Sequence, residues 1–147
     1  MKKYGLAALG AVTLALAAPQ MAMAQDSPFT GGDYVEVTGV TVDDGHFMDY
    51  ATFLTGYYKD QEEYAKKQGW QTSWEILANV FKRAGEPDLY LVRRYRDIPD
   101  GAEGEKRAAK IRAEVKMSDA QMEAQSGDRA KFRHVMGTQL LQVLKPK

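Results

Sequence analysis

Hydrophobic and polar residues alternate along two neighbouring stretches of the chain, residues 74–81 and 89–96. Alternation with a period of two predicts β-strands, because successive side chains of a strand point to opposite faces. The connection between them, residues 84–87, contains Gly and Pro, which is typical of a hairpin loop. We therefore expect an antiparallel hairpin within residues 70–97.

The register of this hairpin follows if Arg83 faces Asp88 across the loop. Glu75 then lies opposite Arg96, and opposite charges that face each other stabilise a strand pair. The more apolar face of the hairpin carries Trp74, Ile76, Ala78, Val80, Leu89, Leu91, Arg93 and Tyr95. The other face carries a second apolar set, which consists of Leu77, Phe81, Tyr90 and Val92. Both faces therefore need partial cover from the rest of the chain.

A long amphipathic helix is predicted upstream of the hairpin, because apolar residues recur there every three or four positions. The residues of this stripe are Phe47, Tyr50, Leu54, Tyr57, Gln61 and Tyr64. Asp43 and Asp44 precede the helix and suit its dipole, while Gly69 is placed to end it.

Two further strands are predicted near the ends of the chain. Residues 33–42 are rich in Val, Thr and Tyr, and residues 138–144 alternate in the same way as the hairpin strands. Within the first of these strands, Gly39 marks either a bulge or a close approach of another group to the backbone.

The segment between the hairpin and the last strand is predicted to be helical. A narrow stripe favours a second, looser helix over residues 102–117. Ser118 and Gln121 have the spacing of a capping box, which predicts that a short helix begins there. Residues 126–128, Ser-Gly-Asp, are expected to interrupt it, and a further turn or two is expected over residues 129–136.

The order strand, helix, strand, strand, helix, strand predicts an α+β chain with the ferredoxin-like βαββαβ arrangement, a four-stranded antiparallel sheet with helices on one face. The uncovered face of the sheet is expected to carry Leu77, Phe81, Tyr90, Val92 and Val40. An exposed apolar patch marks an association surface. We therefore expect a symmetric homodimer in which two sheets meet face to face.

With this element order and its long Tyr-rich first helix, the chain resembles the dimeric α/β-barrel superfamily over about residues 33–144. The resemblance implies that two ferredoxin-like subunits pack their sheets into a shared barrel, with a cavity between sheet and helices. Members of this superfamily include cofactor-free oxygenases, haem enzymes, isomerases and modules without a known activity. The resemblance therefore implies a fold but does not select a function.

The start of the chain has the composition of a secretory signal peptide. Lys2 and Lys3 precede an apolar run over residues 6–18, and the small residues Ala22-Met23-Ala24 follow it. We expect a signal peptide over residues 1–24, a flexible lead-in over 25–32 and a single domain over 33–147. The mature protein is then periplasmic or secreted and has no membrane contact after cleavage.

Composition narrows the class of partner. The chain has 20 Lys and Arg against 20 Asp and Glu, so it lacks the basic excess that is typical of nucleic-acid binding. It contains no Cys, and its stability in an oxidising compartment must come from a core or a partner subunit. The sequence holds no nucleophile elbow, Walker-type loop, dinucleotide fingerprint or zinc signature, so we expect no cofactor and no metal.

The two histidines are weak candidates for chemistry. His134 is a possible general base or haem ligand, and the alternative is a solvent-facing residue on a short helix. His46 lies near Asp43, Asp44 and Asp49, which is a weak pattern for a metal site; acids at such a position more often cap a helix.

Arg93 is the leading candidate for ligand binding, because the register places it on the apolar face beside Ala78 and under the helices. A buried guanidinium needs an acceptor, which is either a ligand carboxylate or phenolate, or a Glu or helix carbonyl of the protein itself. Trp74, Tyr95 and Tyr57 are expected to form aromatic walls around it.

Three hypotheses for the function remain. The first is an exported dimeric domain that binds a small apolar or anionic molecule. The second is a cofactor-free oxygenase or isomerase that acts on a small aromatic or carbonyl compound, with His134 or a tyrosine as proton carrier. The third is a structural dimer without a ligand. Whether the protein is an enzyme is left open by the sequence.

Overall fold

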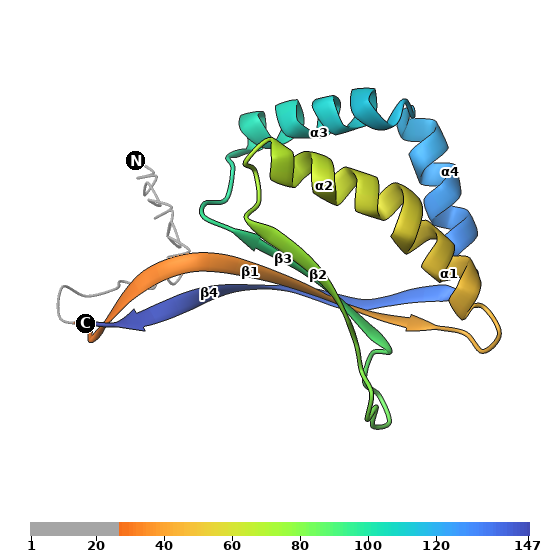
Figure 1. Cartoon of the computed structure of the whole chain (residues 1–147), viewed down its shortest axis with the longest axis horizontal. Helices are drawn as coiled ribbons and strands as arrows, with labels where there is room; N and C mark the ends of the chain where they lie inside the picture. Colours follow the sequence, from red (N-terminus) through yellow and green to blue (C-terminus); the bar gives the residue numbers. More distant parts are fainter. Residues whose placement is uncertain (1–26) are drawn as a thin grey trace, which may run out of the picture.

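The computed structural model describes residues 27–147, and the expected signal peptide, residues 1–24, lies outside this range. The elements in chain order are β1 (Phe29–Val42), α1 (Phe47–Phe53), the π-helical segment η1 (Leu54–Tyr58), α2 (Lys59–Lys67), β2 (Ser73–Ala78), β3 (Leu89–Tyr95), α3 (Gly101–Val115), α4 (Asp119–Arg129) and β4 (Arg133–Pro146). The strands form one antiparallel sheet in the order β2-β3-β1-β4, and the helices lie together on one of its faces (Figure 1). This is the predicted ferredoxin-like fold, with its second helical unit divided into α3 and α4.

The two strands of the hairpin, β2 and β3, pair in a register that is shifted by four residues from the expected one. Leu77 lies opposite Tyr90, where we expected Phe81. The connection is therefore longer than predicted, and the backbone N–H of Asn79 donates to the carbonyl oxygen of Asp88 at 2.8 Å to close it. Because a shift by an even number of residues keeps the alternation in phase, the paired residues of the hairpin keep their predicted faces. Val80 and Phe81 were expected on these faces, but they lie beyond the end of β2, in the loop.

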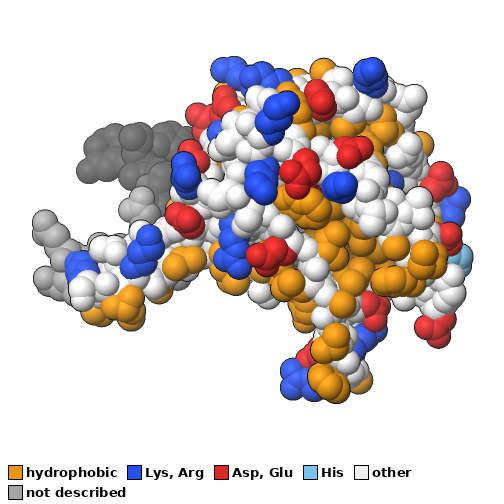
Figure 2. Space-filling model, viewed as in Figure 1, with side chains coloured by type: hydrophobic (Ala, Val, Ile, Leu, Met, Phe, Trp, Pro, Cys, Tyr) orange, Lys and Arg blue, Asp and Glu red, His pale blue; other side chains and the backbone are white. Residues whose placement is uncertain are grey.

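Polar side chains in the loop explain why the strands end early. The side-chain amide of Asn79 donates to the carbonyl oxygen of Pro87 at 3.1 Å and to the carboxylate of Glu86 at 3.2 Å. Glu86 also accepts from the backbone N–H of Arg83 at 3.1 Å. Local bonds of this kind compete with strand pairing. The resulting loop carries Phe81 with 89% of its surface exposed, and Figure 2 shows hydrophobic side chains gathered on this projection at the bottom of the view.

Gly39 has both properties that its position predicted. The pairing of β1 with β4 shifts between Gly39 and Val40, which is a bulge. A Cβ atom at Gly39 would lie 2.6 Å from Cγ of Pro87, so only glycine leaves room for the proline ring. Val40 pairs with Leu89 and is fully buried beneath the helices. Its expected place on the uncovered face is therefore wrong, because the phase of β1 is set by its pairing with β3.

The two terminal strands are longer than predicted. β1 begins at Phe29, within the segment expected to be a flexible lead-in, and β4 begins at Arg133. Together they form a two-stranded ribbon that runs past the helices toward the left of Figure 1. The capping box of Ser118 and Gln121 is present, as predicted. However, α4 continues through residues 126–128 without interruption, and the turns expected over 129–136 are replaced by the end of α4 and the start of β4.

The core lies between the sheet and the first helix. Its buried members are Val40, Tyr50, Leu54, Tyr58 and Leu89. After Leu54, the helix residues that are buried against the sheet are Tyr58 and Glu62. The sequence pattern predicted that Tyr57 and Gln61 would take these inward positions. The π-helical turn causes this change, because it holds more residues per turn than an α-helix. None of the helices among residues 27–147 is long and apolar enough to cross a membrane.

Candidate functional site

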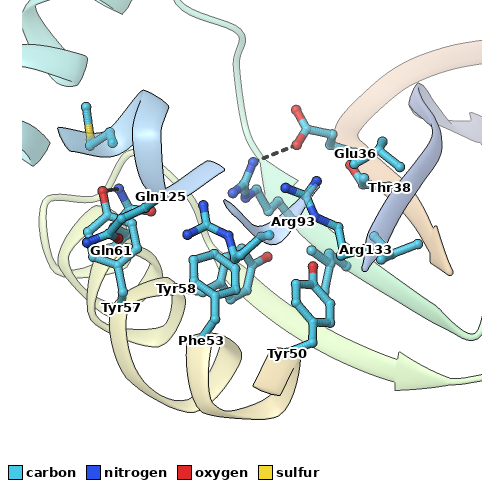
Figure 3. Close-up of a pocket in the computed structure, with 15 residues that line it drawn as sticks. Glu36, Thr38, Tyr50, Phe53, Tyr57, Tyr58, Gln61, Arg93, Gln125 and Arg133 are labelled. Atoms are coloured by element: carbon cyan, nitrogen blue, oxygen red, sulfur yellow. Dashed lines mark hydrogen bonds and ion pairs between the residues drawn. The ribbon is translucent and has the colours of Figure 1, made fainter. Parts of the chain in front are cut away.

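A cavity of about 330 Å³ lies between the sheet and the helices. Strands β1, β3 and β4 form its floor, and α1, η1, α2 and α4 form its walls (Figure 3). Apolar and aromatic side chains such as Val40, Leu91 and Phe53 line it together with polar and charged groups such as Thr38 and Arg93. Its size is typical of small-molecule sites.

Arg93 reaches this cavity from β3, and its guanidinium is held by two acids of the protein. Its Nε donates to Oε1 of Glu62 at 2.9 Å, and its Nη1 donates to Oε1 of Glu36 at 2.9 Å. The acceptors are thus internal carboxylates, which is one of the two alternatives that the sequence left open. Burial lowers the pKa of Arg93, but the hydrogen bond and the charge of Glu62 outweigh this effect and hold the pKa above its usual value. Because of the shifted register, its neighbour on β2 is Trp74 and not Ala78.

Glu62 is the least accessible member of this network, with 3% of its surface exposed. The side-chain amide of Gln71 donates to Oε2 of Glu62 at 3.0 Å and to its backbone carbonyl at 2.9 Å. Both carboxylate oxygens of Glu62 are therefore engaged within the protein. The network joins α2 to β3 beneath the cavity.

Two other arginines face the cavity without an acid partner. Arg129 ends α4 and Arg133 begins β4. The Nε atom of each is buried and has no hydrogen-bond partner. Over residues 27–147, no ion pair joins either guanidinium to a carboxylate. The guanidinium carbon of Arg129 lies 3.9 Å from the ring centroid of Phe53, which is a cation–π contact.

Three tyrosines of the first helix line the same cavity: Tyr50, Tyr57 and Tyr58. Burial raises the pKa of each phenol above its ordinary value, and the charge of Glu62 adds to this effect at Tyr58. The hydroxyl of Tyr57 accepts from Nε2 of Gln61 at 2.8 Å, whereas the buried hydroxyl of Tyr58 has no hydrogen-bond partner among residues 27–147. At neutral pH these groups are therefore protonated.

The candidate residues from the sequence occupy different places. Arg93 and Tyr57 line the cavity. Tyr95 lines a second cavity of about 310 Å³ on the other side of Arg93. Trp74 does not line the cavity but contacts Tyr58, which does. The two rings pack edge to face, with 6.0 Å between their centroids.

Neither histidine lies at the cavity. His134 is on β4 and not on the short helix that we expected, and its exposed ring places Nε2 3.0 Å from Oδ1 of Asp43. His46 lies with Nδ1 2.8 Å from Oδ2 of Asp49 and stacks on Phe132. No side chain caps the start of α1, so the capping role expected for the acids is wrong. The described part of the chain contains no group of three or more His, Cys, Asp or Glu residues that could hold a metal ion.

The sequence did not indicate Arg129 and Arg133 as site residues. Their spacing of four predicts two neighbours on one face of a solvated helix. In the structure the chain changes from helix to strand between them, and this change directs both side chains to the cavity. A basic pair next to a predicted helix end was the only local signal.

Comparison with models of protein families gives no match, and comparison with curated proteins gives none either. Among solved structures, the chain is similar to a protein named "Putative antibiotic biosynthesis monooxygenase from Nitrosomonas europaea". The two chains share 16% sequence identity with a TM-score of 0.37, and the match covers 81% of this chain and 93% of the other. The fold assignment rests on the strand order and register described above.

Proposed function

We propose that this protein is an exported, dimeric domain that binds a small, partly apolar molecule in the cavity between the sheet and the first helix. The observation that carries the proposal is a space of about 330 Å³ that is lined by aromatic rings and by two arginines, Arg129 and Arg133, which have no acid partner among residues 27–147. Cavities of this size that combine aromatic walls with polar groups are typical of small-molecule sites.

The geometry favours binding over acid–base catalysis. An efficient general acid or base has a pKa near the working pH and lies within reach of the substrate. His134 is outside the cavity, and burial moves the pKa values of Tyr50, Tyr57 and Tyr58 away from neutrality. The proton carriers named for the oxygenase or isomerase alternative, His134 or a tyrosine, are therefore unsuited to that role at this cavity.

Exposed apolar residues support the dimer. Leu77 on the uncovered face has 47% of its surface exposed, and Leu141 on the ribbon has 49%. A large apolar surface is typical of an association site, and two copies of one sheet face can bury it symmetrically. We expect sedimentation to give a dimer at micromolar concentration and the variants Leu77→Asp and Leu141→Asp to weaken it. A stable wild-type monomer would contradict this part of the proposal.

Ligand binding can be tested with a neutral aromatic probe such as 1-naphthamide, because a ligand that binds only the folded state raises its melting temperature. The variant Val135→Phe places a ring against the cavity wall, and Val143→Phe is its control on the ribbon of the same strand. We expect the probe to stabilise the wild type and the control but not Val135→Phe. Equal stabilisation of all three proteins would show that the probe binds elsewhere.

Export is tested by sequencing the N-terminus of the protein recovered from the periplasm or the medium. We expect the mature chain to begin near Gln25. A chain that keeps residues 1–24 and stays inside the cell would contradict the export hypothesis.

A further inference from the structure

The charges around the cavity do not balance. Arg93, Arg129 and Arg133 all line it, and Glu36 is the one acid among the lining residues. Glu36 and Glu62 together compensate Arg93. The remaining two guanidiniums have no acid partner within the described range. Three arginines thus stand against two carboxylates, so the surroundings of the cavity carry a net positive charge.

The backbone holds the two arginines in fixed positions. Only three residues separate them, and the backbone N–H of Phe132 donates to the carbonyl oxygen of Arg129 at 3.2 Å within this turn. The carbonyl oxygen of Phe132 then accepts from the backbone N–H of Asp43 at 2.8 Å, which ties the start of β4 to the end of β1. A site whose geometry is set before binding loses less entropy when a ligand arrives.

The contact with Phe53 orients one of the two guanidiniums. The guanidinium carbon of Arg129 lies 3.9 Å from the ring centroid, so the aromatic ring occupies one side of this group. No hydrogen bond within residues 27–147 engages its two terminal nitrogens, and a planar carboxylate is an acceptor that matches the guanidinium fork. Burial and the nearby charge of Arg133 lower the pKa of Arg129, which indicates that the two cations repel each other. An anion between them would relieve this repulsion.

The aromatic residues that line the cavity favour a particular kind of apolar group in the ligand. Phe53, Tyr50, Tyr57 and Tyr58 provide aromatic surfaces. Aromatic rings favour flat, apolar partners, and a phenol can donate one further hydrogen bond. The cavity of about 330 Å³ accommodates a molecule of one or two rings.

We propose that Arg129 and Arg133 form a carboxylate-binding pair and that the ligand of the cavity is a small aromatic carboxylate. This inference rests on the proposed binding function and adds the chemical class of the ligand. In this proposal the positive charges that bind the ligand belong to these two residues. Arg93 has a structural role, because it is already paired with Glu36 and Glu62.

The test compares 1-naphthoate with its neutral isostere 1-naphthamide by isothermal titration calorimetry at two salt concentrations. We expect naphthoate to bind the wild type about 10- to 100-fold more tightly than the amide, which is the range for charge-assisted hydrogen bonds. The variants Arg129→Gln and Arg133→Gln should lose most of this preference and keep their affinity for the amide. Arg112→Gln is the control, because Arg112 pairs with Asp119 on the helical layer and does not line the cavity.

The outcomes separate the two levels of the proposal. Equal affinity of the wild type for acid and amide would overturn the carboxylate assignment and leave the binding function intact. Failure of both compounds to bind would overturn the binding function as well. If inorganic phosphate displaces naphthoate with a similar affinity, the pair is a general anion site. This result would overturn the assignment of the ligand as an aromatic carboxylate. Urea unfolding of Arg133→Gln without ligand should show no loss of stability, since the substitution removes one of two repelling charges, whereas Arg129→Gln also loses the cation–π contact with Phe53.

Discussion

Replacing Arg93 by Met should destabilise the fold strongly, because it leaves the carboxylate of Glu62 without its cation. Glu62 has 3% of its side-chain surface exposed, so water cannot replace the guanidinium on that side. Removal of one partner from a buried ion pair costs about 3–5 kcal/mol. The Arg93 side chain itself is 33% exposed and Gln71 continues to donate to Glu62, so we expect a value near the lower limit, about 3 kcal/mol.

A double-mutant cycle tests the reason for this loss. Glu62→Gln alone should cost about 1–2 kcal/mol, because Arg93 keeps Glu36 as a partner. The double variant should cost less than the sum of the two single changes by about 1–2 kcal/mol, since it removes the unpaired charge. The free energy of unfolding is measured by urea titration at one fixed protein concentration, which matters for a chain expected to dimerise.

The control for this cycle is Arg94→Met, the neighbouring position on the opposite face of β3, which should change stability by no more than about 0.5 kcal/mol. The reasoning fails if Arg93→Met costs less than about 1 kcal/mol or if the two single losses simply add in the double variant. Either result would mean that the network of Glu62 does not depend on the guanidinium.

Three further predictions concern other parts of the fold. Gly39→Ala should lower the free energy of unfolding, measured by urea titration, by about 1–3 kcal/mol, because the new methyl group would meet Pro87. The control Gly104→Ala lies in open space on α3 and should not destabilise the fold, so equal effects of the two changes would contradict the packing argument. Ser118→Ala should cost about 1 kcal/mol through loss of the cap of α4, and an unchanged urea midpoint would show that the cap is unimportant. Burial raises the pKa of Tyr95 to about 12 from 10.0, so its contribution to stability is complete below pH 10 and is lost as the pH rises through 12. Tyr95→Phe should flatten this alkaline decline of the unfolding free energy, and an identical decline in both proteins would contradict the assignment.

Local signals predicted the elements better than their pairing. The alternation in residues 74–81 and 89–96 identified the hairpin and both of its faces, and the spacing of Ser118 and Gln121 located the start of α4. The register was wrong because it depends on side chains in the loop, such as Asn79, that close the hairpin earlier than its charges suggest. Similarly, the place of Val40 depends on the pairing between β1 and β3, which the pattern within β1 does not contain.

The site was predictable only in part. The alternation along β3 placed Arg93 correctly beneath the helices, and the hypothesis of an internal Glu partner was among those considered. The other two arginines reach the cavity because α4 ends where it does and β4 starts directly afterwards. This change from helix to strand depends on contacts with the first helix and with β1. The local sequence pattern contains no signal for such contacts.

The wide turn over Leu54–Tyr58 leaves the first helix with one residue more than a regular helix of the same phase requires. An α-helix advances about 100° per residue, so without Gly56 the side chains of Tyr58 and Glu62 would fall on the line that continues from Tyr50 through Leu54. Shortening the chain here by one residue would thus preserve the inward partners of the sheet, so the extra residue of this turn is not required for the core.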